Sequence, residues 1–175
     1  MRPLDRRAVL TGAGGLAAAL AGCATGLSPG GDDDPSYDRL ARMATYVSPN
    51  ADLELPAELP TVEHTHNADL LVLPGDTAHG PDQAADWLAE DQVIALLGDG
   101  AERRWLDWAG SDAFEDAFDN RGVGDAEPDP TLVVAAAVGH LVHTYRHSWA
   151  DAPRDRDVLR ALDEDLDAIA EETPA

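Results

Sequence analysis

The chain has 175 residues, a formal net charge of −22 and a hydrophobic content of 44%. This length and apolar content fit one domain with a modest core and a tail, rather than a disordered chain. The negative charge excludes sequence-independent binding to nucleic-acid phosphates, and the single cysteine excludes a disulfide scaffold or a cysteine-rich metal centre.

Residues 1–22 have the organisation of an export signal. Arg6 and Arg7 precede an apolar, small-residue stretch over 8–21, which is shorter than the roughly 20 apolar residues of a membrane-spanning helix. The order Asp5-Arg6-Arg7-Ala8-Val9-Leu10 resembles the twin-arginine export motif, although Asp5 stands where that family usually has Ser or Thr. The resemblance implies the twin-arginine export machinery as a partner, and it separates residues 1–22 from the folded body.

The apolar stretch ends in Leu20-Ala21-Gly22-Cys23, which resembles a lipoprotein box. Small residues suit a peptidase groove, and a thiol is the nucleophile that lipid transfer requires. The resemblance implies that lipidated Cys23 is the first mature residue and anchors the chain at the extracytoplasmic face of the cell membrane. The alternative is a chance cysteine at the end of a cleaved signal peptide.

The charged residues are unequal in kind. Aspartate outnumbers glutamate by 24 to 10, and all 12 basic residues are arginine. A carboxylate-rich surface repels itself at low ionic strength, and molar salt shortens the Debye length to about 3 Å and screens that repulsion. The composition resembles that of secreted and surface proteins of extreme halophiles, with an acidic protein from a GC-rich mesophile as the alternative. The acidity is interpreted as adaptation to salt, not as an acidic binding face.

Residues 23–36 are rich in Gly, Ser, Pro and Asp, which bury no core, so we expect a flexible tether. Residues 37–175 are expected to form the single folded domain. Its first elements are predicted as a short helix over 37–44, a strand over 45–47 and two short strands over 52–55 and 61–66.

The middle of the chain alternates between strand and helix patterns. Strands are predicted over 68–73 and 92–97, and helices over 81–91, 101–109 and 111–119. Continuous apolar runs suit strands that are covered on both faces. The order predicts an α/β fold, a small three-layer sandwich with a mostly parallel sheet. The hydrophobic pattern of 68–109 resembles the middle of flavodoxin-like and glutamine-amidotransferase-like domains.

The segment 132–149 is compatible with two structures. As a helix, it would be capped by Asp129 with Pro130 in its first turn. As strands, it would form 132–138 and 142–149 with a bend at Gly139, and its β-branched and aromatic residues favour this interpretation. A final amphipathic helix is predicted over 154–172.

Asp99 and His79 are the candidate catalytic residues, because each follows a predicted strand. Gly98-Asp99-Gly100 lies at the strand-to-helix turn where the amidotransferase-like family carries a cysteine nucleophile. Asp99 in that place argues against Cys or Ser acyl chemistry, whereas an aspartate nucleophile is chemically feasible. The alternative is an aspartate that caps the following helix.

Two pairs among the six histidines are candidate metal ligands. His64 and His66 would share a face of a predicted strand, and His143 and His147 would share a face as helix or as strand. Imidazole suits copper, zinc or iron. No pair has the spacing of His-Glu-x-x-His, so scattered surface histidines are the alternative.

The sequence therefore predicts a membrane-anchored lipoprotein whose domain binds an unknown ligand or a membrane or surface protein, without a cofactor and without nucleic acid. Non-catalytic binding is favoured. An anchored hydrolase-like enzyme using Asp99 and a histidine, and a histidine-based metal-binding lipoprotein, are the alternatives. The four tryptophans are expected in the core, with a sugar-stacking platform as the alternative.

Overall fold

A computed structural model describes residues 36–122 and 130–173. The chain divides into two units, 1–34 and 35–175, and the fold below is that of the second unit. The predictions for Arg6, Arg7, Cys23, the tether up to residue 35 and the cap at Asp129 lie outside the described residues. Within them, no helix combines the length and the apolar character needed to cross a bilayer.

Five strands form one mixed sheet in chain order. The first three strands, β1 (Thr45–Val47), β2 (Leu70–Pro74) and β3 (Val93–Leu97), pair in parallel. The fourth strand, β4 (Leu132–Val138), lies antiparallel between β3 and β5 (Leu141–His147). Four strands therefore run in one direction and β4 opposes them. The predicted α/β class is confirmed, with a sheet that is mixed and leans towards parallel.

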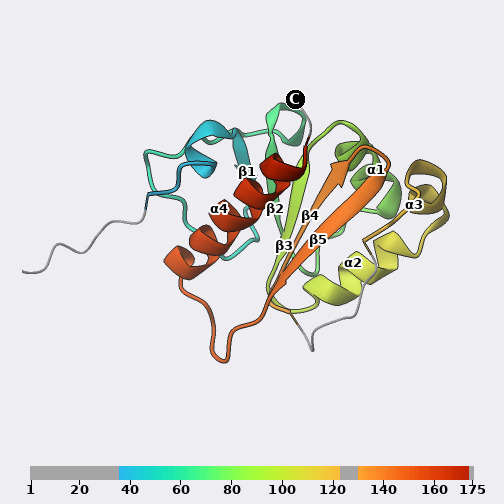
Figure 1. The fold of residues 1–175 in the computed structure, drawn as a ribbon. Helices are drawn as coiled ribbons and strands as arrows, with labels where there is room; N and C mark the ends of the chain where they lie inside the picture. Colours follow the sequence, from blue (N-terminus) through green and yellow to red (C-terminus); the bar gives the residue numbers. More distant parts are fainter. Residues whose placement is uncertain (1–35, 123–129, 174–175) are drawn as a thin grey trace, which may run out of the picture. The chain divides into compact units, whose positions relative to one another are not determined.

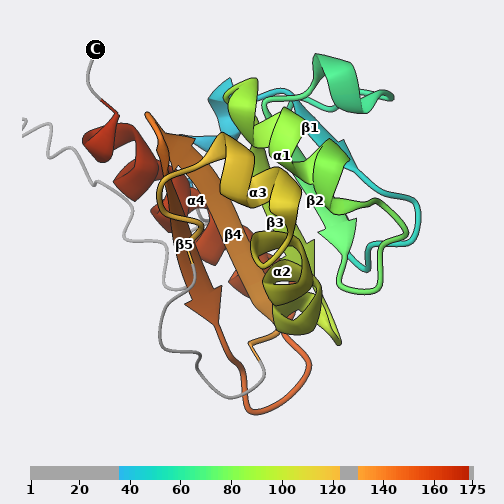
Figure 2. The same ribbon diagram turned by 90° about the vertical axis from the view of Figure 1, so that its right-hand side faces the viewer.

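Helices cover both faces of this sheet. Figures 1 and 2 show α1 (Pro81–Ala89), α2 (Ala101–Ala109) and α3 (Asp112–Ala117) on one face, and α4 (Asp155–Glu172) across the other. Side chains alternate between the faces along each strand, so Leu71 packs with the first three helices and Leu70 packs with α4. This double cover explains the continuous apolar runs of β2 and β3.

Residues 132–149, for which the sequence allowed either a helix or two strands, contain the β4–β5 hairpin. The strand interpretation is therefore confirmed and the helix interpretation is wrong. Gly139, between the strands, has φ +64°, a left-handed conformation that glycine adopts without a steric cost. The first five residues of β4, all apolar, are buried, as expected for a strand between two others with both faces covered.

The predictions for residues 37–67 were largely wrong outside β1. The expected helix over 37–44 is reduced to a 3-10 turn, η1 (Leu40–Arg42). No strand forms over 52–55, and 61–66 supplies only one bridge, from Thr61 to Thr45, before a second 3-10 turn, η2 (Thr65–Asn67). Prolines at both ends of the intervening loop lack the N–H that a ladder needs.

Three tryptophans lie in the core, as expected. Trp87, Trp105 and Trp108 are at most 5% exposed on the face covered by α1, α2 and α3. Trp149, which follows β5, is only half-buried. It packs against the core on the α4 side of the sheet but is not itself a core residue, in contrast to the expectation for all four tryptophans.

Candidate functional site

Strands β2 and β3 end, and β4 begins, at one edge of the sheet. Backbone hydrogen bonds from Gly75 and Gly98 link the three strands there. The backbone N–H of Gly75, after β2, donates to the Leu97 carbonyl at 2.7 Å. A Cβ on Gly75 would lie 2.6 Å from the Asp99 carbonyl oxygen and 2.6 Å from the Ala101 nitrogen. The close approach of these two backbones therefore requires glycine at position 75.

The turn that carries Asp99 is fixed on its other side by the start of β4. The N–H of Gly98 donates to the Thr131 carbonyl at 2.7 Å, which places the start of β4 beside the end of β3 and makes β4 antiparallel. Gly98 and Gly100 both have positive φ values, +92° and +84°, so the turn around Asp99 needs both glycines. Asp99 thus projects from a rigid turn at the carboxyl end of β3.

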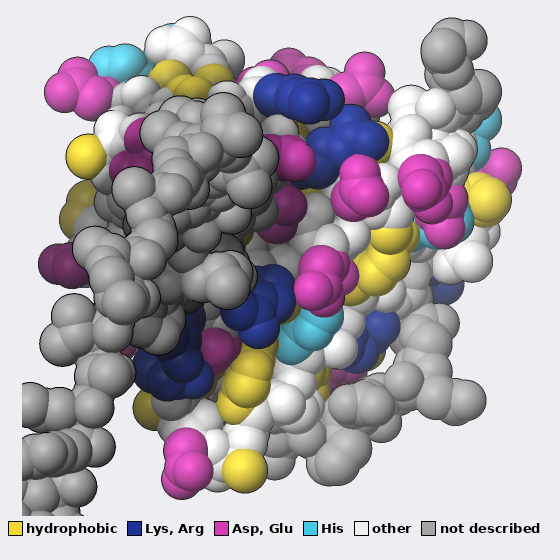
Figure 3. Space-filling view, turned by 60° about the vertical axis from the view of Figure 1, so that its left-hand side comes forward, with side chains coloured by type: hydrophobic (Ala, Val, Ile, Leu, Met, Phe, Trp, Pro, Cys, Tyr) yellow, Lys and Arg dark blue, Asp and Glu magenta, His cyan; other side chains and the backbone are white. Residues whose placement is uncertain are grey.

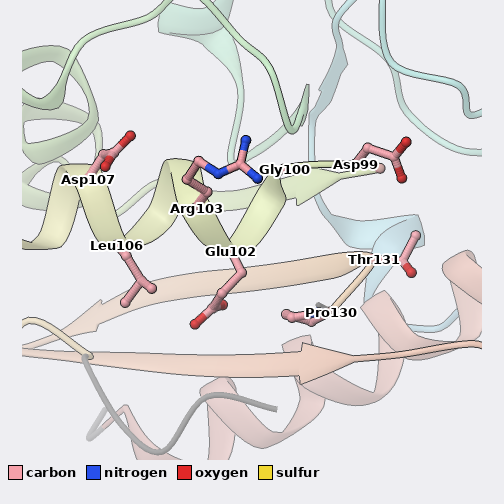
Figure 4. A pocket seen from close by; sticks show the side chains of 9 residues that line it. Asp99, Gly100, Glu102, Arg103, Leu106, Asp107, Pro130 and Thr131 are labelled. Carbon is pink, nitrogen blue, oxygen red and sulfur yellow. The ribbon is translucent and has the colours of Figure 1, made fainter. Parts of the chain in front are cut away.

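Three pockets surround this turn, and Asp99 lines all of them. The first, the α2 pocket, has a volume of about 560 Å³ and lies between the turn, α2 and the residues Pro130 and Thr131 (Figure 4). The second, the β2 pocket, is about 230 Å³ and extends to Asp76. The third, the Trp149 pocket, is about 480 Å³ and extends to the loop before α4. We call this region the Asp99 edge.

Glu102, which lines the α2 pocket, belongs to a buried ion pair. Figure 4 shows Glu102 pointing from α2 towards the sheet, and its carboxylate accepts from Arg146 Nε of β5 at 3.0 Å. The side chains of Glu102 and Arg146 are 11% and 9% exposed. Arg146 Nη1 also donates to Thr144 Oγ1 at 2.7 Å. The pair therefore links α2 to the edge strand β5. Removal of either partner would leave a buried charge without compensation, so the link is expected to be important for stability.

The Asp99 carboxylate is exposed and makes no hydrogen bond or ion pair with another residue in the described part of the chain. The N-cap residue of α2 is Gly100, with no side-chain cap, so the predicted capping role of Asp99 is wrong. A nucleophilic aspartate needs a partner group that handles protons nearby. The geometry leaves Asp99 placed to receive a ligand rather than activated by a neighbour.

His79 is engaged away from Asp99. Its Nδ1 lies 2.8 Å from Gln83 Oε1, and its ring meets Trp87 edge-on with centroids 5.0 Å apart. The His79 carbonyl accepts from Trp108 Nε1 at 3.2 Å. His79 lines none of the three pockets at the Asp99 edge, so these pockets do not bring the two candidate catalytic residues together.

The first histidine pair does not have the expected strand geometry. His64 precedes η2 and His66 lies within it, and their rings stack with centroids 5.4 Å apart and planes 11° apart. Within residues 36–122 and 130–173, no three His, Cys, Asp or Glu side chains are grouped so that they could hold a metal ion.

The second histidine pair shares a face of β5, as predicted, but each histidine contacts its own carboxylate on α4. His143 Nδ1 lies 2.6 Å from Glu172 Oε2, and His147 Nε2 lies 2.9 Å from Asp165 Oδ2. Tyr145 lies between them on the strand, and its pKa is raised by burial and by the negative charges of Glu172 and Asp165. These contacts form a β5–α4 seam of separate pairs, not one shared metal centre.

Asp165 is the buried member of the β5–α4 seam. Its side chain is 6% exposed, and burial raises the pKa of its carboxyl above the ordinary value of 3.8, while the hydrogen bond and charge of His147 oppose the rise. Sequence reasoning missed this residue, although its position between Leu162 and Leu166 on the apolar stripe of α4 was a usable signal.

Comparisons with known proteins identify no relative of this chain. No protein-family model, no curated protein and no solved structure matches the chain.

Proposed function

We propose that the chain is a lipid-anchored lipoprotein of the extracytoplasmic membrane face, of halophilic type, whose domain binds a small ligand at the Asp99 edge. The observation that supports this most directly is the position of Asp99 in the walls of three adjoining pockets. Ligands of open α/β sheets bind outside the carboxyl ends of the strands, which is where these pockets lie. Their volumes of about 230 to 560 Å³ suit small molecules.

The placement at the membrane rests on the first residues of the sequence. Arg6 and Arg7 with the following apolar stretch support export, and Cys23 at the end of a lipoprotein-type box supports lipidation. Stable anchoring usually takes more than one lipid chain or a second membrane signal. The proposed partners are accordingly the export machinery and the membrane, together with the ligand.

Binding is favoured over catalysis by the surroundings of Asp99. Its carboxylate is exposed and has no imidazole or second carboxylate in hydrogen-bond contact among the described residues. Arg103 lines two of the three pockets and Arg104 lines one of them, and an arginine stays protonated and cannot act as a base. An exposed carboxylate and arginine on a rigid turn are suited to holding a polar ligand.

A ligand screen by thermal unfolding tests the site. Full-length protein is purified from membranes in detergent and molar salt, and compounds are sought that raise its Tm. We expect Asp99→Asn to remove the shift, because the pockets share this carboxylate. Asp116→Asn, on α3 and in a different pocket, serves as the control and should keep the shift. Compounds that shift the wild type and Asp99→Asn equally would show that the ligand site is elsewhere.

A further inference from the structure

The Trp149 pocket differs in its lining from its two neighbours at the Asp99 edge. Its charged lining groups are three carboxylates, those of Asp52, Asp99 and Asp151, and no arginine or histidine among the described residues lines it. Arg103 lines both the α2 pocket and the β2 pocket, and Arg160 lines a fourth pocket beside His147. Within the described part of the chain, the negative charge of the Trp149 pocket is therefore not offset by a lining cation.

The three carboxylates are brought together by the fold rather than by one acidic stretch. Asp52 lies in the connection between β1 and β2, Asp99 follows β3, and Asp151 lies in the loop between β5 and α4. None of them makes a hydrogen bond or an ion pair with another residue of 36–122 or 130–173. Other acids, such as Asp157 and Asp167, do pair with arginines. The carboxylates of the pocket are thus available to a ligand.

Trp149 supplies an aromatic wall. Its ring stacks on His147 with centroids 5.9 Å apart and planes 22° apart, and it packs at the margin of the α4-side core. These contacts hold the indole in place while part of it lines the cavity. Tryptophan has the aromatic face that attracts cations most strongly, when the cation lies within about 6 Å of the ring centroid.

Apart from Thr131 and Gly98, the remaining lining residues are apolar, and this favours an organic cation over a metal ion. Leu97, Pro153 and Val158 line the cavity together with two alanines. A hard metal cation needs a cage of oxygen ligands and gains nothing from such a wall. A cation that carries methyl or methylene groups would bury them there and place its charge against Trp149 and the carboxylates.

We propose that the Trp149 pocket binds an organic cation, namely a substituted ammonium group, between Trp149 and the carboxylates of Asp52, Asp99 and Asp151. The proposal rests on the proposed function, in which the Asp99 edge is the ligand site, and it names the ligand class. In molar salt the carboxylates are screened within about 3 Å, so the face of Trp149 supplies most of the selectivity for positive charge and the carboxylates act only at close range.

Choline and its neutral carbon isostere, 3,3-dimethylbutan-1-ol, are the probes for this inference. Each is titrated by calorimetry into the full-length protein in detergent and molar potassium chloride. We expect choline to bind at least about tenfold more tightly than the isostere, because the two molecules differ in charge and not in shape. Trp149→Leu and Asp151→Asn should each weaken choline binding several-fold. Asp116→Asn, on α3 and in a pocket apart from the Asp99 edge, should leave it unchanged.

Trp149→Phe separates loss of the ring from loss of the fold, because it keeps an aromatic face and should retain most of the choline affinity. Equal binding of the isostere, undiminished binding to Trp149→Leu, or no choline binding would each overturn the inference. If the thermal screen finds only neutral or anionic ligands that depend on Asp99, the cation inference fails and the proposed function stands. If no ligand depends on Asp99, the proposed function fails as well.

Discussion

At the scale of single residues, the Asp99 edge depends on Gly75. The backbone atoms of the neighbouring turn occupy the space that any Cβ at position 75 would need. Backbone cannot rotate away as a side chain can, so a larger residue must separate the ends of β2 and β3. The pockets that Asp99 lines are built on this contact, and the position of the carboxylate follows from it.

We expect Gly75→Ser to destabilise the protein by about 1–3 kcal/mol, the usual cost of overpacking a closely packed site. Gly80→Ser is the matched control, because no atom lies within 4 Å of its added Cβ and serine is a good residue for the N-cap of α1. Midpoints of denaturant unfolding measure both effects. Equal midpoints for the two variants would contradict the close approach.

The residues of the site show what a local pattern can predict. The position of Asp99 after a buried strand placed it correctly at the edge of the sheet. His79, the other candidate residue, does not join Asp99 in these pockets, because its imidazole contacts Gln83 and Trp87 on α1. The convergence of Asp52 and Asp151 on the Trp149 pocket depends on tertiary contacts between segments about 100 residues apart, and no local pattern encodes it.

At the scale of elements, amphipathic periodicity was the most reliable guide. It gave α2 with its observed bounds and α4 to within one residue, because each helix has one apolar face to bury. Local pattern could not give the direction of β4, because an apolar run suits any strand that is covered on both faces. The strands predicted within residues 52–66 did not form. Leu53 and Leu59 are buried in the core, but they belong to a loop, so their apolar character did not indicate a strand.

In the β5–α4 seam, the titratable carboxyl of Asp165 on α4 contacts His147 on β5, beside the apolar packing of the helix. Burial raises the pKa of Asp165 in the folded chain, so the folded state holds this proton more tightly than the unfolded state. The stability that this group contributes is fully present below its unfolded pKa of about 3.8 and is lost as the pH rises through its folded pKa.

Asp165→Asn removes this titration and keeps an oxygen that can accept from His147. We expect the stability of the variant relative to the wild type to increase as the pH is raised from below 3.8 through the folded pKa. Guanidinium unfolding of both chains over a series of pH values measures the difference. A difference that is constant with pH, or that decreases, would contradict the raised pKa.

At the scale of the whole molecule, charge is the dominant property. The full chain carries a net charge of −22, and Figure 3 shows carboxylates and arginines intermingled on one face of the described residues. Long-range repulsion between the excess carboxylates opposes the compact state when salt is dilute. Salt relieves this repulsion without any change in the contacts of the core.

We expect Tm to fall when potassium chloride is lowered from molar concentration to 0.1 M, where the Debye length lengthens to about 10 Å. A neutral osmolyte added at equal osmolality is the control, and it should restore less of the loss than salt does, because it does not screen charge. A Tm that is unchanged or higher in dilute salt would contradict the interpretation of the acidic composition.

The proposal as a whole requires that the domain be held at the membrane by its first mature residue. The most direct measurement is the mass of the N-terminal peptide of the protein purified from membranes of a halophilic archaeal host. We predict a chain that begins at Cys23 and carries added lipid mass, and a precursor that stays in the cytoplasm when Arg6 and Arg7 are both changed to lysine. A mature chain that begins at another residue, or an unmodified Cys23, would contradict the account.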